Sequence, residues 1–392
     1  MNKKRILILA NGRLDSYKAY TQNFLSIAKT AKKKGISVTL TGLTRSNISF
    51  LNDFADKEIV IRKSLWGIII LQVRNLIELL SKEYDIVIFG SMYTWMFPIY
   101  YFILKINKNK EIIYYMQDPV PETYLLMNVK VNKSMLNALF YNFAIICEKS
   151  ICSIADIILL PGNGYLNIIN QRNNLDNKTI LFSYNTWGIQ KHIDRPISTD
   201  VIYNVKDKFN INEKSPIILY SGKIQRWIRG LEMQLRVLKK IVEIYPNALF
   251  IITGTGESEW IKEYMEELQI TQNVLLTGNV TDVELKVIYE VSDIMIFPKV
   301  DYLLPTKFFE ALLINVIPIV WYKSEDMVKI LGDMAITYEG SDESLSETLK
   351  NVIKNINRYR TEINDLSSKV KQYHKISEKS FIEAVTMNGD YQ

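Results

Sequence analysis

Positively charged side chains gather after one predicted strand in the second half of this chain of 392 residues. Lys223 and Arg226 follow an apolar run at residues 216–222, and Arg229 and Gly230 come soon after them. Lysine and arginine suit diphosphates because their charged donors match phosphate oxygens. Such a cluster by itself is more often a solvated face, so its meaning depends on what lies beside it.

Glycines follow this strand and the next two predicted strands. Gly222 ends the first, Gly254 and Gly256 follow the second, and Gly278 and Val280 follow the third. Without a Cβ, glycine permits tight turns and a close approach of the backbone to a ligand. One Gly-x-Gly pair usually marks only a turn, but several such strand ends at one edge of a parallel sheet favour a nucleotide-type ligand.

The stretch from residue 294 to residue 321 reads IMIFPKVDYLLPTKFFEALLINVIPIVW and predicts strand, loop, helix and strand. The helix is expected to begin at Thr306, after Pro305, and free N–H groups at a helix N-terminus attract phosphate. Lys307 opposes the helix dipole, which is easier to explain if an anion lies beside it. Glu310 lies one turn further along the same face. An ordinary capped helix without a ligand is the alternative.

Length and composition predict a globular protein of two domains. Hydrophobic residues make up 48% of the sequence and charged residues 23%. Cys147 and Cys152 form neither a metal-binding pair nor a disulfide framework, which fits a reducing cytoplasm. We expect the apolar run after the N-terminal MNKKR to be a strand rather than a signal peptide, and no apolar run approaches the ~20 residues of a membrane span.

Basic residues are concentrated in the first part of the chain. Lys and Arg outnumber Asp and Glu by 21 to 11 in residues 1–150 but are outnumbered by 31 to 27 in residues 151–392. A basic surface suits nucleic acid or an anionic membrane, and the lack of a nucleic-acid motif favours the membrane. Two very apolar predicted helices in the segment 66–110 would make a peripheral membrane contact. Helices packed in the core are the alternative.

Strands and helices alternate along both halves of the chain, which predicts parallel βαβ units. Residues 185–200 have no clean period, and we interpret them as a linker. The expected fold class is α/β, with two Rossmann-like doubly wound domains facing across a cleft. Residues 1–187 would form the first domain and residues 188–365 the second, with a helical segment at residues 366–392 that packs back on the first.

One carboxylate of the first domain is a candidate for proton transfer. Asp118 follows an expected strand at residues 111–117, and a carboxylate at such a strand end can take a proton from an attacking hydroxyl group. A turn-forming aspartate before Pro119 is the alternative. His192 and His374 have no partner visible in the sequence, and we expect both to be structural.

Residues 180–360 resemble the donor-binding half of GT-B glycosyltransferases, above all the large retaining group often called family 4. In that family a strand ends in Gly-Arg, and a Lys-Gly pair follows. Here a lysine, Lys223, stands in the position of the family's arginine, and an arginine, Arg229, stands in the position of its lysine and is followed by Gly230. The two cations are therefore exchanged in order, but their spacing is the same. The family's Gly-x-Gly, its base-contacting strand end and its Pro-x-Lys loop with a following Glu correspond to Gly254 to Gly256, Gly278 to Val280, and Pro305, Lys307 and Glu310. The first domain shares only the architecture.

The resemblance implies a role for each residue. Lys223 and Arg229 would hold the donor diphosphate and stabilise the leaving group, Thr306 would offer backbone N–H groups to phosphate, and Glu310 would accept from ribose hydroxyls. Gly12, after the first strand, would approach the donor from the other domain. The remaining donor-binding positions would be Gly222, Arg226, Gly254, Gly256, Val280, Tyr302, Pro305 and Lys307. No Asp-x-Asp pair occurs in the sequence, so we expect no metal and no other cofactor.

Tyr302 departs from the family pattern, because it stands eight residues before Glu310, where the family often has a second Glu that contacts the donor sugar; Asp301 stands beside it. We expect a retaining transfer of a sugar from a nucleoside-diphosphate donor, with a UDP-sugar favoured, to a glycan or lipid-linked acceptor. The setting would be bacterial surface polysaccharide or glycolipid assembly, in the cytoplasm or on the inner face of the plasma membrane. A non-catalytic partner of a glycosyltransferase and a nucleotide-sugar epimerase are the alternatives.

Overall fold

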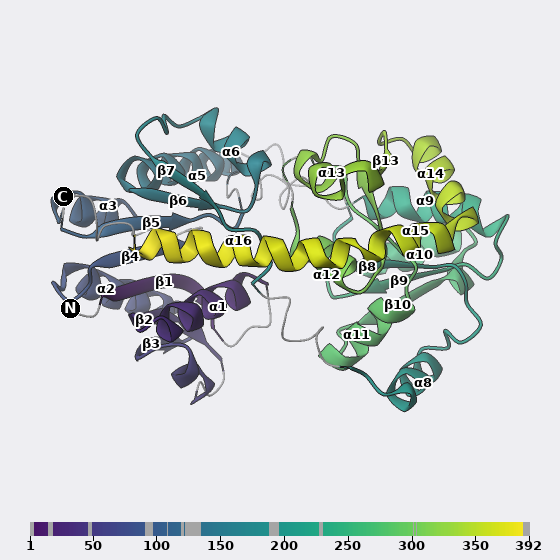
Figure 1. Cartoon of the computed structure of the whole chain (residues 1–392), viewed down its shortest axis with the longest axis horizontal. Coiled ribbons are helices and arrows are strands. Elements are labelled where there is room, and N and C mark those ends of the chain that lie inside the picture. Colours follow the sequence, from purple (N-terminus) through teal and green to yellow (C-terminus); the bar gives the residue numbers. More distant parts are fainter. Residues whose placement is uncertain are drawn as a thin grey trace. The chain divides into compact units, whose positions relative to one another are not determined.

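The computed structural model describes residues 4–14, 19–45, 49–90, 97–107, 109–118, 121, 135–187, 196–226, 230–300, 302 and 304–386. The chain divides into two compact units. Unit 1 comprises Met1–Gly188 and Tyr373–Gln392, and unit 2 comprises Ile189–Gln372. Each unit is built around one parallel sheet flanked by helices (Figure 1).

Unit 1 has a seven-stranded sheet in the order β3-β2-β1-β4-β5-β6-β7. Its strands are β1 (Arg5–Arg13), β2 (Ser37–Thr44), β3 (Lys57–Arg62), β4 (Ile86–Gly90), β5 (Glu111–Tyr115), β6 (Ile157–Leu160) and β7 (Thr179–Phe182). Helix α1 (Ala19–Lys33) connects β1 to β2, toward the β3 edge of the sheet. Helix α2 (Leu65–Leu80) connects β3 to β4, in the opposite direction along the sheet. Because parallel crossovers are right-handed, α2, α3 (Phe97–Ile106), α5 (Met135–Ile154) and α6 (Asn163–Asn170) lie on the face opposite α1.

Unit 2 has a six-stranded sheet in the order β10-β9-β8-β11-β12-β13. Its strands are β8 (Ile217–Ser221), β9 (Leu249–Thr253), β10 (Val274–Gly278), β11 (Ile294–Ile296), β12 (Ile317–Trp321) and β13 (Ile336–Tyr338). Its helices are α8 (Thr199–Lys208), α9 (Leu231–Val242), α10 (Glu259–Glu267), α11 (Asp282–Val291), α12 (Thr306–Leu313), α13 (Glu325–Leu331), α14 (Asp342–Lys354) and α15 (Ile356–Asn364). Two parallel sheets of this kind confirm the predicted α/β class and its Rossmann-like units.

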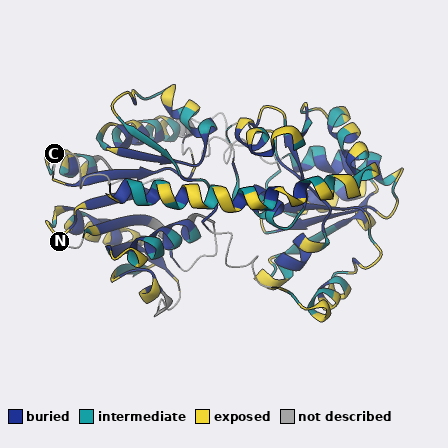
Figure 2. Ribbon diagram, in the orientation of Figure 1, coloured by how far each residue is buried: buried dark blue, intermediate teal, exposed yellow. Residues whose placement is uncertain are grey.

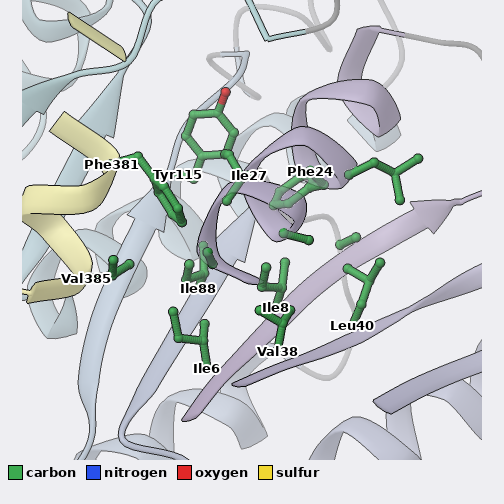
Figure 3. Packing of buried hydrophobic residues seen from close by; sticks show 14 of the residues in the cluster. Ile6, Ile8, Phe24, Ile27, Val38, Leu40, Ile88, Tyr115, Phe381 and Val385 are labelled. Atoms are coloured by element: carbon green, nitrogen blue, oxygen red, sulfur yellow. The ribbon is translucent and has the colours of Figure 1, made fainter. Parts of the chain in front are cut away.

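The strands of both sheets are largely buried (Figure 2), as expected when helices cover both faces of a parallel sheet. In unit 1, Ile6 and Ile8 of β1 and Phe24 of α1 belong to one apolar cluster. The last helix, α16 (Leu366–Thr386), contributes Phe381 and Val385 to the same cluster (Figure 3). A segment that is separated from the rest of unit 1 by the whole of unit 2 in the sequence therefore completes the unit 1 core.

The boundary between the two units falls within α16. The expected final segment, residues 366–392, corresponds to α16, which begins at Leu366; its residues up to Gln372 belong to unit 2 and those from Tyr373 onward belong to unit 1. Leu366 and Val370 are buried, and the Lys369 ammonium donates to the carbonyl oxygen of Ile330 at 3.4 Å. The first turns of α16 therefore pack with unit 2, and only the rest of the helix packs with unit 1.

Candidate functional site

The carboxyl ends of the unit 2 strands meet at one edge of the sheet, because all the strands run parallel. This edge carries the predicted residues Gly222, Lys223, Gly254, Gly256, Val280, Tyr302, Pro305, Thr306, Lys307 and Glu310. Ligands of open α/β sheets bind at such an edge. The residues come from four different strand ends, so the sheet places together side chains that the sequence separates widely.

Two of the glycines at this edge are required by the packing of the loops against each other. A Cβ built on Gly254 would lie 2.0 Å from the carbonyl oxygen of Gly222, and one built on Gly256 would lie 2.0 Å from that of Ile224. Both residues also have positive φ angles, +122° and +152°. The sequence interpretation assigned these glycines to a close approach of a ligand, but the adjacent backbone already accounts for both.

The predicted phosphate-binding cations differ in their surroundings. The Lys223 side chain is exposed. Its ammonium group forms no ion pair with any residue that the structure describes. Arg226, by contrast, is 2.9 Å from the Glu232 carboxylate and lies over the Trp260 ring at 5.6 Å. Arg229 falls outside the described residues, so its role stays a prediction. Lys223 is therefore better placed than Arg226 to bind a phosphate group.

Glu310 is held at this edge by two donors. The Tyr289 hydroxyl donates to Glu310 Oε2 at 2.8 Å, and the Lys307 ammonium donates to the same oxygen at 2.7 Å. Lys307 also lies 5.8 Å from the centre of the Tyr289 ring. The Glu310 side chain is 15% exposed. Among the described residues no hydrogen bond is made to its second oxygen, Oε1, so the carboxylate is positioned while it keeps acceptor capacity for a ligand.

This geometry changes the interpretation of Lys307. We expected its unfavourable place in the first turn of α12 to indicate a bound anion, but Glu310 is itself the anion, one turn away. The position of Lys307 therefore does not by itself indicate phosphate. Burial, followed by the Glu310 carboxylate, raises the pKa of Tyr289 well above its usual 10.0, with a hydrogen bond to Ser221 opposing the shift. Tyr289 thus stays a neutral donor at all physiological pH values.

Tyr289 is the residue of this cluster that sequence reasoning missed. Tyr289 belongs to α11, and only 2% of its surface is exposed. In the sequence it looks like any core aromatic residue. Nothing in its local pattern indicates that its hydroxyl group reaches a carboxylate on another helix. The signal is tertiary: α11 and α12 connect β10 to β11 and β11 to β12, and because both connections run in the same direction along the sheet the two helices lie side by side on one of its faces.

The loop before α12 completes the edge. Pro305 is the N-terminal capping position of α12 and Thr306 its first residue; the Phe308 N–H donates to the Pro305 carbonyl oxygen at 3.0 Å, and the N–H groups of Thr306 and Lys307 precede this first bond of the helix. Tyr302 is half-buried in the same loop, and Val280 is half-buried after β10. Asp301 lies outside the described residues. The prediction that backbone N–H groups bind phosphate keeps its structural basis here.

The two predicted residues of unit 1 lie at the corresponding edge of its own sheet. Gly12 is near the end of β1, where the pairing with β2 changes register between Leu9 and Arg13. Asp118 is exposed and follows β5 by three residues. Tyr115, at the end of β5, has its pKa raised mainly by complete burial, and the Asp118 carboxylate raises it further. The negative charge of Asp118 therefore lies near the Tyr115 hydroxyl.

In the ranges that the structure covers, no group of three His, Cys, Asp or Glu side chains is close enough to hold a metal ion. In the same ranges, no helix combines the length and the apolarity that crossing a bilayer requires.

Comparison with known proteins identifies the domain that carries the site. Residues 202–369 match the model of the family described as glycosyl transferases group 1. An uncharacterized glycosyltransferase of Methanocaldococcus jannaschii is 25% identical over 124 residues, which cover 31% of this chain and 30% of that relative. The match spans less than a third of the relative's own length. Unit 2 therefore contains a glycosyl transferases group 1 domain.

Solved structures share the fold of the whole chain. The structure of Anabaena HepE in complex with UDP-glucose has a TM-score of 0.69 and 13% sequence identity, and the likeness covers 98% of this chain and 99% of HepE. WaaG, described as a glycosyltransferase involved in lipopolysaccharide biosynthesis, has a TM-score of 0.67 and 12% identity, covering 99% of this chain and 100% of WaaG. The chain has the GT-B fold of these proteins.

Proposed function

We propose that this chain, with a glycosyl transferases group 1 domain in unit 2, transfers a sugar from a UDP-sugar to a glycan or lipid-linked acceptor with retention of configuration. The observation that carries the proposal is the Glu310 carboxylate, held by Tyr289 and Lys307 at the ligand-binding edge of that domain. A carboxylate with a free acceptor oxygen suits the vicinal hydroxyl groups of a ribose.

The donor assignment draws on both the geometry and the relatives. Anabaena HepE, which shares the fold, is known in complex with UDP-glucose, and this favours uracil among the bases. Lys223 and Arg229 would hold the diphosphate, and the first turn of α12 would offer N–H groups at Thr306. These cations take the place that a divalent metal has in other transferases, so we propose that turnover needs no metal.

In the transfer, the bond between the anomeric carbon and the β-phosphate oxygen breaks and the acceptor oxygen bonds to that carbon. Negative charge develops on the departing UDP, where Lys223 and Arg229 would stabilise it more strongly than in the ground state. The acceptor proton would go to Asp118 of unit 1. WaaG, which shares the fold, is described as acting in lipopolysaccharide biosynthesis, and this favours surface polysaccharide or glycolipid assembly in a bacterium.

Incubation with radiolabelled UDP-sugars and a bacterial lipid extract tests this function, with released UDP and labelled product as separate readouts. We expect acceptor-dependent transfer that EDTA does not reduce and that Lys223→Ala slows about a hundredfold, the cost of one lost electrostatic contact in a transition state. Lys329→Ala, which removes an exposed lysine of α13, should have no effect. Binding of UDP without any transfer would indicate a non-catalytic partner, and a new nucleotide-sugar formed without acceptor would indicate an epimerase.

A further inference from the structure

Helix α2 of unit 1 differs from an ordinary surface helix in the distribution of its polar and apolar side chains. Its buried side combines Leu71 and Leu79 with the polar residues Gln72, Asn75 and Glu78. Its exposed side carries large apolar side chains three or four residues apart: Trp66, Ile69, Ile70, Val73, Ile77 and Leu80. A surface helix normally turns its apolar stripe to the core and its polar side to water. Helix α2 therefore packs on the sheet, against β2 and β3, and at the same time leaves a stripe of large apolar side chains on the surface.

The inward polar residues have partners, so this orientation is built into the fold. The Tyr100 hydroxyl of α3 donates to the backbone and side-chain oxygens of Gln72. Glu78 accepts from the Lys57 ammonium at 3.0 Å and from the Tyr84 hydroxyl. Rotating α2 to bury its apolar stripe would break these bonds and leave the buried hydroxyl groups of Tyr84 and Tyr100 without these partners. The apolar stripe must therefore remain on the surface.

The apolar surface continues over the two neighbouring helices. Helix α3 packs against both α2 and α5. It exposes Ile99, Phe102 and Ile106, and α5 exposes Leu139 and Ile146. Among the described residues, thirteen of the eighteen exposed large apolar side chains lie on these three helices. We call this surface the α2–α3–α5 face, and a contiguous apolar surface of this extent marks an interaction site.

The charges on this face all have one sign. The exposed charged residues of the three helices are Arg74, Lys105 and Lys149. Their acidic residues, Glu78 and Glu148, are buried and paired with Lys57 and Arg172 at 3.0 Å and 2.8 Å. An apolar stripe bordered by cations, with every carboxylate turned inward, complements an anionic lipid surface. A second copy would instead bring like charges together.

We infer that the α2–α3–α5 face docks on the surface of an anionic phospholipid bilayer. Trp66, 73% exposed at the start of α2, would lie at the headgroup level, where tryptophan is enriched. Phe102 and Ile106, 63% and 83% exposed, would enter the boundary of the acyl chains. The docking needs no nucleotide, so its failure in a test would leave the proposed transfer activity untouched.

Vesicle sedimentation tests the docking with matched variants. The triple variant Trp66→Ser, Ile70→Ser, Phe102→Ser replaces side chains that are already exposed, so it should fold as the wild type does. Its control, Tyr203→Ser, Ile244→Ser, Val283→Ser, removes equally exposed apolar groups from unit 2. We expect the wild type and the control to sediment with vesicles of phosphatidylcholine and phosphatidylglycerol, and the first variant to stay in solution.

A second pair of variants tests the charge. Replacement of Arg74, Lys105 and Lys149 by Gln should weaken binding to the anionic vesicles about a hundredfold, because each cation near such a surface contributes roughly a fivefold factor. Gln at the exposed Lys329, Lys354 and Lys371 of unit 2 should change nothing. Brominated lipid should quench the wild type more than Trp66→Phe, which keeps the apolar contact but removes that fluorophore.

Three results would overturn the inference. The wild type could stay in solution with anionic vesicles, or the Trp66 triple variant could bind as well as the wild type. The wild type could also prove dimeric by light scattering and become monomeric in that variant, in which case a second copy covers the face. A monomeric wild type that binds anionic vesicles through these residues supports the docking.

Discussion

The Gly254→Ala substitution tests whether the Gly-x-Gly loop of unit 2 is kept for packing or for a ligand. The added Cβ would lie 2.0 Å from the carbonyl oxygen of Gly222, whereas real Cβ contacts are essentially never shorter than 3.0 Å. The loops after β8 and β9 must therefore separate by about 1 Å or more. Separation strains the bonds that join them, from Gly222 N–H to the Thr253 oxygen at 3.0 Å and from Ile224 N–H to the Thr255 oxygen at 3.0 Å.

The expected loss of stability follows from these contacts. Each weakened backbone hydrogen bond contributes about 0.5–1.5 kcal/mol, and alanine at a φ of +122° adds strain of about 1–3 kcal/mol. We therefore expect Gly254→Ala to lower the free energy of unfolding of unit 2 by about 2–6 kcal/mol. Gly278→Ala is the control, because its Cβ meets nothing within 4 Å and its φ of +65° costs only about 1–2 kcal/mol.

Scanning calorimetry of the full chain measures the stability, and titration calorimetry with UDP measures binding on the same samples. The packing account predicts a lower melting temperature for Gly254→Ala than for Gly278→Ala. A Gly254→Ala protein that melts like the wild type but no longer binds UDP would refute it, because the glycine would then serve only the approach of the ligand.

Three further predictions concern single side chains. Tyr289→Phe should weaken UDP binding about tenfold, because Glu310 loses one of its two donors and a hydrogen bond to a charged group is worth about 1.5–3 kcal/mol; unchanged affinity in titration calorimetry would contradict this. Phe381→Ala should destabilise unit 1 by about 3–5 kcal/mol, since the ring is fully buried in that core, and the unit 2 transition should not move in calorimetry. Burial lowers the pKa of His374 from its usual 6.5, so the unfolded chain binds the extra proton first. The melting temperature of unit 1 should therefore fall as pH drops below about 6.5, and less so in His374→Gln.

The architecture of both units was predictable because strand and helix periods alternate clearly along the chain. Helix α8 is an exception, since the sequence prediction assigned no element to residues 201–215. The signals for it were present: Asp200 lies in its first turn, and Lys206 and Lys208 lie in its last. The irregular composition just before this helix concealed them.

The side-chain partners within the site were less predictable than its location. The ion pair of Lys307 with Glu310 was visible in the spacing of three residues, although we attributed the cation to a missing anion. The contact between Tyr289 and Glu310 joins two helices, and no local pattern reports it. Helix α2 shows the same limit, because its apolar content predicts a helix, but the partners that hold its polar side inward, Lys57 and Tyr100, belong to other elements.

Isothermal titration of UDP into the wild type, Glu310→Ala and Glu290→Ala tests the central claim most directly. Glu290 is a matched control, a partly exposed glutamate on α11 that pairs with Lys286 at 3.6 Å. The account predicts that UDP binds the wild type and Glu290→Ala equally and binds Glu310→Ala at least about tenfold more weakly, the cost of a lost charged hydrogen bond. Equal affinity for all three proteins, or no binding to the wild type at millimolar UDP, would contradict the placement of a donor site around Glu310.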